Sequence, residues 1–206
     1  MITILDYGAG NLRSVQRACH VLGEASVVVQ DPDALRGAER IVFPGIGAAP
    51  TAMENLLRLG VIEALVESID RGVPTLGICI GAQVALEHSE EGNTPCLGLI
   101  PGVTRRFDLK QDGLKVPHIG WNEVRTVRPH PLLEGIETGD EFYFVHSYYL
   151  DPSEASDCYA VSDYGGDFCC ALGRDSFFAT QFHPEKSGRF GLSLLERFAR
   201  WEGETC

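Results

Sequence analysis

The chain has 206 residues, of which 44% are hydrophobic and 22% are charged, as is typical of a folded globular domain and unlike a disordered or fibrous chain. It carries 29 acidic and 17 basic residues, a formal net charge of −12, which argues against a nucleic-acid surface because phosphates bind clustered cations. The longest uncharged apolar stretch, residues 72–86, is interrupted by proline and glycine and is shorter than the roughly 20 residues of a membrane span. The N-terminus lacks the features of a signal peptide, so we expect no membrane span and a cytoplasmic location.

The first half of the chain alternates short apolar runs with helical patterns, which predicts a parallel sheet covered by helices. Strands are expected at residues 2–5, 27–29, 40–43 and 74–78. Helical spacing of apolar residues predicts one helix from Leu12 to Leu22, with Asn11 as its N-cap, and another from Ile62 to Ile69.

The second half is richer in strand patterns, separated by Gly, Pro and Asp turns. Strands are expected at residues 103–107, 119–124, 142–149, 158–161, 168–172 and 177–182. A closing helix places Leu194, Leu195, Phe198 and Trp201 on one stripe. Because no repeat, low-complexity tract or linker divides the chain, the predicted fold class is α/β, a single domain with a central, mostly parallel sheet flanked by helices and a strand-rich second half.

Cysteines are unusually frequent, but their odd number and the absence of a C-x-x-C pair give no disulfide framework, zinc site or redox motif. They are Cys19, Cys79, Cys96, Cys158, Cys169, Cys170 and Cys206. We expect most of them to be reduced, inert core residues. The histidines at positions 20, 88 and 130 have no second ligand at metal spacing, so no metal or cofactor is predicted.

Residues 77–83, Gly-Ile-Cys-Ile-Gly-Ala-Gln, have the form of a nucleophile elbow with a cysteine in place of serine. Side chains at Gly77 and Gly81 would collide where the strand and the following apolar helix cross. The turn would hold Cys79 in a strained conformation at a helix N-terminus, where the helix dipole favours the thiolate. The alternative is a buried cysteine in a glycine-rich turn.

Residues 181–185, Gln-Phe-His-Pro-Glu, end a strand-like run and place a carboxylate two positions after a histidine. Pro184 stiffens this turn so that Glu185 can reach back to the imidazole of His183. A single histidine is more often structural, but a cysteine elbow followed by His183 and Glu185 fits a triad of nucleophile, base and orienting carboxylate.

A third segment, Pro44-Gly45-Ile46-Gly47, directly follows a predicted strand. Such a loop can direct a backbone N–H, here that of Gly47, toward an oxyanion, with the N–H of Ile80 as the second donor. By itself the segment is an ordinary Pro-Gly turn.

Together these segments resemble the class I, or triad, glutamine amidotransferases, in which the elbow with Gln83, the His-Pro-Glu segment and the Pro-Gly loop occur in this order. The resemblance covers essentially the whole chain and implies one amidotransferase domain over residues 1–206. The family's elbow more often has Leu and Met where this chain has Ile80 and Ala82, a change that alters the packing behind the sulfur.

Three further segments are similar to the glutaminase subunits of imidazole glycerol phosphate synthase in histidine biosynthesis. They are residues 6–11 (DYGAGN), 117–122 (PHIGWN) and 143–149 (YFVHSYY). The PHIGWN segment discriminates best among the three.

The resemblance implies glutamine hydrolysis by Cys79, His183 and Glu185, with glutamine held by Gln83 and by the backbone around Ser147 and Tyr148. The alternative interpretation of Ser147 is an exposed hydroxyl at the end of a strand.

The resemblance also implies a partner, a (β/α)₈-barrel cyclase subunit that uses the ammonia to make imidazole glycerol phosphate and the purine precursor AICAR. Residues implied at the docking face are Asn11, Trp121, Asn122 and Lys186. On charge alone, Lys186 would be a solvated side chain beside a glutamate, and the interface interpretation is preferred.

Alternative functions are a glutaminase that serves another synthase, such as pyridoxal phosphate synthase, and a non-catalytic docking subunit with a relict elbow. The PHIGWN segment argues against the first, and the joint presence of nucleophile, base and carboxylate argues against the second. A dinucleotide site is excluded because Arg13 stands where the fingerprint needs its third glycine.

Overall fold

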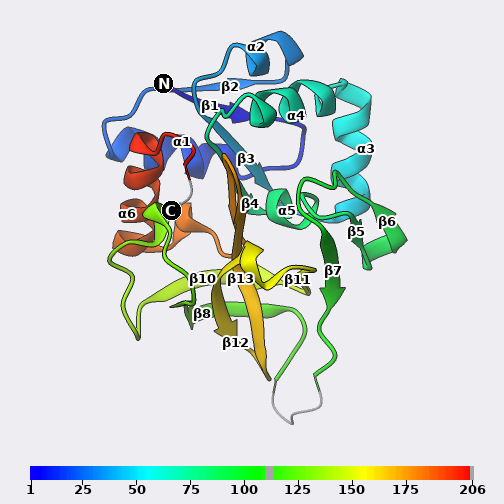
Figure 1. Cartoon of the computed structure of the whole chain (residues 1–206), viewed down its shortest axis with the longest axis vertical. Coiled ribbons are helices and arrows are strands. Elements are labelled where there is room, and N and C mark those ends of the chain that lie inside the picture. The colour runs from blue at the N-terminus through cyan, green and yellow to red at the C-terminus, as the bar shows by residue number, and fades with distance from the viewer. Residues whose placement is uncertain (110–113, 205–206) are drawn as a thin grey trace.

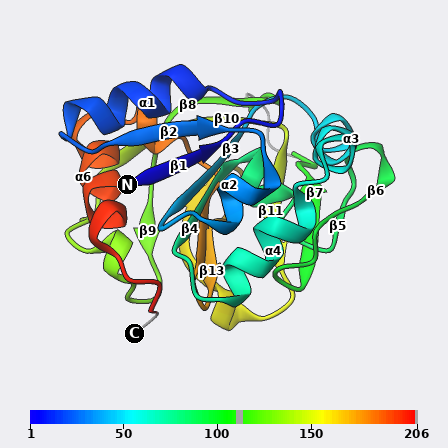
Figure 2. The same cartoon turned by 90° about the horizontal axis from the view of Figure 1, so that it is seen from above.

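The computed structural model describes residues 1–109 and 114–204, and its central feature is a large β-sheet with helices on both sides (Figure 1, Figure 2). In the described residues this sheet has twelve strands, ten of which follow the order β2-β1-β3-β4-β14-β13-β11-β7-β5-β6, while β12 pairs with β13 and β9 pairs with β12. The strands of the first half and those of the second half therefore share one hydrogen-bonded sheet.

The strands nearest the N-terminus form a parallel array. Strand β14, from far along the chain, extends this array by pairing with β4. Its members are β2 (Ser26–Val29), β1 (Ile2–Leu5), β3 (Ile41–Gly45), β4 (Thr75–Cys79) and β14 (Phe177–Thr180). All residues of β3, β4 and β14 are buried. Covering helices on both faces explain why these strands are apolar on both sides.

Helices cover both faces of this array, with α1 and α6 on one side and α2 and α4 on the other (Figure 2). The α-helices are α1 (Leu12–Val21), α2 (Pro32–Arg36), α3 (Ala49–Leu59), α4 (Ile62–Asp70), α5 (Ile80–Gln83) and α6 (Gly188–Arg200). Four short 3₁₀ turns are η1 (Glu91–Asn93), η2 (Pro131–Leu133), η3 (Ala155–Asp157) and η4 (Pro184–Lys186).

Beyond β14 the sheet becomes largely antiparallel. Its strands there are β5 (His88–Ser89), β6 (Thr94–Pro95), β7 (Gly102–Arg106), β9 (Arg125–Thr126), β11 (Tyr148–Pro152), β12 (Cys158–Asp163) and β13 (Asp167–Arg174). A separate two-stranded antiparallel ribbon, β8 (His118–Glu123) with β10 (Glu141–His146), runs across the lower half of the view in Figure 1, at the height of β12 and β13.

The predicted fold class is confirmed: the parallel array, the flanking helices and the strand-rich second half are all present. Helices α2 and α3 and the two-residue strands were not predicted. The expected single strand over residues 142–149 is wrong, because β10 ends at His146, β11 begins at Tyr148, and the two belong to different sheets. Ser147 lies at this break.

The expected apolar helix after the elbow is present as α5, but it is only four residues long. The backbone carbonyls of residues 84–86 accept hydrogen bonds from the amides of residues 97–100 at 2.9–3.1 Å. These carbonyls are therefore unavailable for further helical turns.

Six of the seven cysteines lie in the described residues, and all six are free thiols. Cys206 lies outside the described residues. Among the helices that are described, none is long and apolar enough to cross a membrane.

Candidate active site

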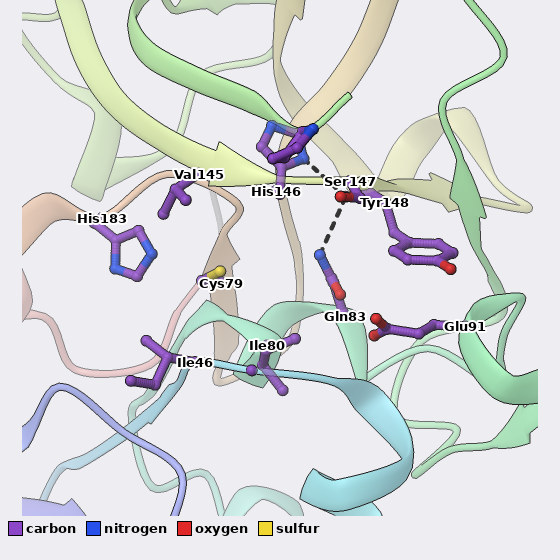
Figure 3. A pocket seen from close by; sticks show the side chains of 12 residues that line it. Ile46, Cys79, Ile80, Gln83, Glu91, Val145, His146, Ser147, Tyr148 and His183 are labelled. Carbon is purple, nitrogen blue, oxygen red and sulfur yellow. Dashed lines mark hydrogen bonds between the residues drawn. The ribbon is translucent and has the colours of Figure 1, made fainter. Parts of the chain in front are cut away.

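Cys79 is the last residue of β4 and has φ 55° and ψ −103°, a backbone conformation that a non-glycine residue rarely adopts. Its side chain is 4% exposed. The strained turn predicted for an elbow is therefore present, and it directs the sulfur into a pocket at the end of the strand (Figure 3).

The two glycines of the elbow are required by close approach of neighbouring chain segments. A Cβ on Gly77 would lie 2.9 Å from the Cβ of Ala179, and one on Gly81 would overlap the backbone oxygen of Phe43. The predicted collisions are thus confirmed, and they explain why the sequence has no side chain at either position.

A helix dipole contributes less at Cys79 than expected, because α5 is a single turn and few peptide dipoles add along it. The positive group that can favour the thiolate is instead the imidazole of His183, which lines the same pocket. His183 follows β14, the strand that pairs directly with β4.

The imidazole of His183 is held from behind by Glu185. Its Nδ1 is 2.8 Å from Oε1 of Glu185, and both side chains are 1% exposed. A carboxylate only accepts hydrogen bonds, so Nδ1 carries a proton and Nε2 is left for the pocket. In the described structure Nε2 is buried and has no hydrogen-bond partner.

The pKa of His183 is raised to about 9 although burial alone would lower it. The Cys79 thiolate and then the Glu185 carboxylate outweigh burial because both stabilise the charged imidazolium. The surroundings of His183 therefore favour its charged imidazolium form.

Two buried glutamines connect the elbow to the opposite wall of the pocket. Nε2 of Gln83 donates to the backbone oxygen of Tyr148 and to Oε1 of Gln181, at 3.1 Å each. Nε2 of Gln181 lies 3.7 Å from Sγ of Cys79. Gln181 was missed by the sequence analysis, although a glutamine two residues before His183 in an apolar run was a usable signal.

The pocket has a volume of about 260 Å³. The sequence-predicted residues that line it are Gly47, Cys79, Ile80, Gln83, Ser147, Tyr148 and His183. The sequence analysis gave no site role to five other lining residues, Ile46, Glu91, Pro117, Val145 and His146, although all but Glu91 lie in segments that it singled out. In Figure 3 the carboxylate of Glu91 lies at the end of the pocket away from His183. A nucleophile, an imidazole and polar backbone thus surround a space suited to a small molecule.

A model of the family described as "Glutamine amidotransferase class-I" matches residues 3–200. The chain belongs to this family. Among solved structures, a crystal structure of a glutamine amidotransferase has a TM-score of 0.74 with 18% identity and covers 96% of this chain and 98% of that one. PurLQS from Thermotoga maritima has a TM-score of 0.73 with 18% identity and covers 97% of each chain. At these identities the likeness concerns the fold.

Curated relatives are much more similar in sequence to this amidotransferase than these solved structures are. The imidazole glycerol phosphate synthase subunit HisH of Dechloromonas aromatica (strain RCB) is 49% identical over 209 residues, covering 98% of this chain and 96% of the relative. The protein of the same name from Aromatoleum aromaticum (strain DSM 19018 / LMG 30748 / EbN1) is 50% identical, covering 97% and 98%.

Two of the four residues implied at a docking face, Trp121 and Lys186, lie together outside the pocket. Trp121 is 52% exposed and contacts the ring of Tyr143 edge-on, with centroids 6.1 Å apart. Nζ of Lys186 lies 5.6 Å from the centroid of the same ring. An exposed tryptophan and a cation therefore share one aromatic neighbour.

The side chains of Asn122 and Asn11 are bound within the chain. Asn122 alternates with Trp121 along β8, and its Nδ2 donates to the backbone oxygen of Asp163 at 2.8 Å. Asn11 occupies the N-cap position of α1 but makes no capping hydrogen bond with its side chain. Its Nδ2 instead lies 3.4 Å from Oε1 of Glu185.

Proposed function

We propose that this amidotransferase is the glutaminase subunit of an imidazole glycerol phosphate synthase, in which it hydrolyses glutamine to glutamate and ammonia. The observation that carries the proposal is the arrangement of the Cys79 elbow and the His183–Glu185 pair around one pocket. Relatives with that subunit name, about half identical over nearly the whole chain, support the choice of synthase. The continuous sheet supports one amidotransferase domain over residues 1–206.

In the proposed mechanism the thiolate of Cys79 attacks the side-chain amide carbon of glutamine. The negative charge that develops on the amide oxygen is met by the backbone N–H groups of Gly47 and Ile80, which border the pocket on the elbow side. The imidazolium of His183 then donates its Nε2 proton to the departing ammonia.

The product of this step is a glutamyl thioester on Cys79. Nε2 of His183, now neutral, accepts a proton from water, which attacks the thioester and releases glutamate. Glu185 keeps the proton of His183 on Nδ1 throughout, so that Nε2 alternates between acid and base. The reaction begins and ends with the same thiolate and imidazolium.

Glutamine would lie along the pocket between its two polar ends. Gln83, Ser147 and Tyr148 form the wall that would hold the substrate beside Cys79. Glu91 would receive the ammonium group of the amino acid, because its carboxylate borders the pocket away from His183 (Figure 3). Glu91 also accepts a hydrogen bond from the amide of Ala49 at 2.8 Å, which holds it in place.

Free ammonia is mostly protonated in neutral water and is then no longer a nucleophile, so the product must reach a second site without mixing with solvent. The partner proposed for this step is a (β/α)₈-barrel cyclase subunit that makes imidazole glycerol phosphate and AICAR in histidine biosynthesis. The proposed contacts on this chain are Asn11, Trp121, Asn122 and Lys186. Six free thiols support a reducing, cytoplasmic location.

The test is glutamate release with and without a cyclase subunit, together with ammonia-dependent synthesis by the complex. Replacing Cys79 by alanine should lower glutamine-dependent synthesis at least about 10³-fold and leave ammonia-dependent synthesis intact. Cys96→Ala, a partly buried thiol outside the pocket, is the matched control and should change neither rate.

Loss of both activities in Cys79→Ala would mean that Cys79 is structural. We expect little glutamate release without the cyclase subunit and a rise on its binding. A larger rise with the synthase subunit of pyridoxal phosphate formation would favour that pathway instead, and no glutaminase activity with any partner would favour a docking role.

A further inference from the structure

Two buried histidines that the proposed mechanism does not use form a hydrogen-bonded line to the pocket wall. His118 on β8 and His146 on β10 are directly opposed in the ribbon. Nδ1 of His118 lies 3.0 Å from Nε2 of His146, and Nδ1 of His146 lies 2.7 Å from the backbone oxygen of Tyr148. The line therefore ends on a residue that borders the pocket.

The outer end of the line is the amide of Asn122, whose orientation is fixed by its neighbours. Its Oδ1 accepts a hydrogen bond from the amide of Glu123 at 2.9 Å, and its Nδ2 donates to the backbone oxygen of Asp163 at 2.8 Å. The second hydrogen of Nδ2 is directed to Nε2 of His118, at 3.4 Å. Nε2 of His118 must therefore accept.

These partners allow one arrangement of protons on the two neutral rings. Since Nε2 of His118 accepts, His118 carries its proton on Nδ1 and donates it to Nε2 of His146. His146 then carries its proton on Nδ1, where the carbonyl of Tyr148 requires a donor. The two ends impose the same direction independently, so every hydrogen bond in the line points from Asn122 toward Tyr148.

The surroundings of the two rings keep them neutral. His118 is stacked against Tyr164, with centroids 3.9 Å apart, and Phe107 and Phe168 pack around His146 at 5.2 and 5.4 Å. Burial lowers the pKa of His118 to about 4 and that of His146 to about 3. Neither ring is charged at neutral pH, as the proton arrangement requires.

The carbonyl of Tyr148 is where this line meets the glutamine wall. It accepts from Nδ1 of His146 and from Nε2 of Gln83, and Figure 3 shows both bonds converging on it. It also belongs to the first residue of β11, directly after the break at Ser147. A donor at Nδ1 of His146 therefore holds this carbonyl at the point where the chain passes from one sheet into the other.

We propose that His118 and His146 are positioning residues, which hold the carbonyl of Tyr148, and through it Ser147 and Gln83, in the geometry that binds glutamine. This proposal rests on the proposed glutaminase function. Its prediction is specific: the two histidines act through a directed line of hydrogen bonds and not through their charge.

The first test needs no substitution and no activity. Nitrogen chemical shifts of the histidine side chains in the full chain, labelled with ¹⁵N-histidine, distinguish the two neutral tautomers and the charged ring. The expected result at pH 7 is a neutral ring protonated at Nδ1 for both His118 and His146. A proton on Nε2 of either ring, or a charged ring, would overturn the proposal.

The second test compares two substitutions at His146 in the complex with the cyclase subunit. Asparagine places an amide nitrogen where Nδ1 lay and can still donate to Tyr148, whereas leucine cannot. For His146→Leu we expect the KM for glutamine to rise about tenfold with kcat changed less than about threefold, and for His146→Asn a KM within about threefold of the unmodified complex.

Equal KM values for the two variants would overturn the proposal, because a role in packing alone does not depend on a donor at that position. An absence of glutamate release by the unmodified complex would overturn the proposed function instead, since that result involves neither histidine.

Discussion

Cys79 and His183 face one pocket from two regions of the molecule that hold their side chains in different ways. The elbow at Cys79 is positioned by backbone crowding, because Gly81 packs against the backbone of Phe43 and Gly77 packs against Ala179. The residues of this region lie in the adjacent buried strands β3, β4 and β14 or in helix α5, which directly follows β4.

The region around His183 is held by hydrogen bonds that reach across the chain. The amide of His183 donates to the backbone oxygen of Tyr143 at 2.9 Å. Ser187 accepts from the amide of Tyr143 at 3.0 Å and donates to the backbone oxygen of His183 at 2.6 Å, while Glu185 holds the ring.

Because of this difference, substitutions around Cys79 and substitutions around His183 should differ in how much stability and activity they remove. An added atom in the close-packed region around Cys79 must displace its neighbours and therefore destabilises the fold strongly. A hydrogen-bonded support can lose one member and keep part of its function, at a cost set by the group left unpaired.

Gly81→Ala should have the largest effect, because its new methyl group would overlap the backbone of Phe43. We expect the free energy of unfolding to fall by about 3 kcal/mol and glutaminase activity of the complex to be lost. Denaturant unfolding and glutamate release measure the two quantities. Gly37→Ala, where the nearest atom is 3.6 Å away and φ is −86°, should stay within about 0.5 kcal/mol. Equal stability of both variants would show that crowding does not hold the elbow.

Glu185→Gln should come next, because it removes the charge that supports the imidazolium of His183. The pKa of His183 is raised to about 9, so activity should fall as pH rises through 9 and the leaving ammonia loses its acid. With Gln at position 185 this alkaline limb should move down by about one pH unit and kcat/KM should drop at least about tenfold. The pH profile of glutamate release measures both, with the exposed Glu196→Gln as control.

The same pKa predicts a change in stability with pH. Because the folded-state pKa of His183 lies above the ordinary value of 6.5, the charged ring stabilises the folded chain fully below pH 6.5. This contribution is lost as pH rises through about 9, and Glu185→Gln should reduce it.

If the alkaline limb of the pH profile of glutamate release does not shift in Glu185→Gln, the assigned role of Glu185 is contradicted.

Ser187→Ala should have the smallest effect of the three. It leaves the amide of Tyr143 and the carbonyl of His183 each without one partner, so we expect the free energy of unfolding to fall by about 1 to 2 kcal/mol. Glutaminase activity should fall only about threefold, because Glu185 still orients the ring. Ser153→Ala, at an exposed site, is the control for the unfolding measurement. A loss as large as that of Gly81→Ala would show that the base is held as rigidly as the nucleophile.

Much of the architecture could be predicted because its signals are local. The apolar runs at β1, β3 and β4 and the stripe of α6 follow directly from burial. The break at Ser147 could not be predicted, since residues 142–149 are all compatible with an extended strand and only pairing with two different partners divides them. The shortness of α5 has a similar origin, because the amides of residues 97, 98 and 100 bond the carbonyls of residues 84–86, which directly follow it.

The amino-acid sequence by itself predicted the elbow glycines, the cysteine proposed as nucleophile and the His-Pro-Glu turn, because each depends on the sterics or chemistry of a few neighbouring residues. Only the tertiary structure decided that Glu91 and His146 line the same pocket, since these two side chains come from separate elements. Their places follow from strand pairing and from the requirement that buried polar groups find partners, and both are satisfied between segments far apart in the chain.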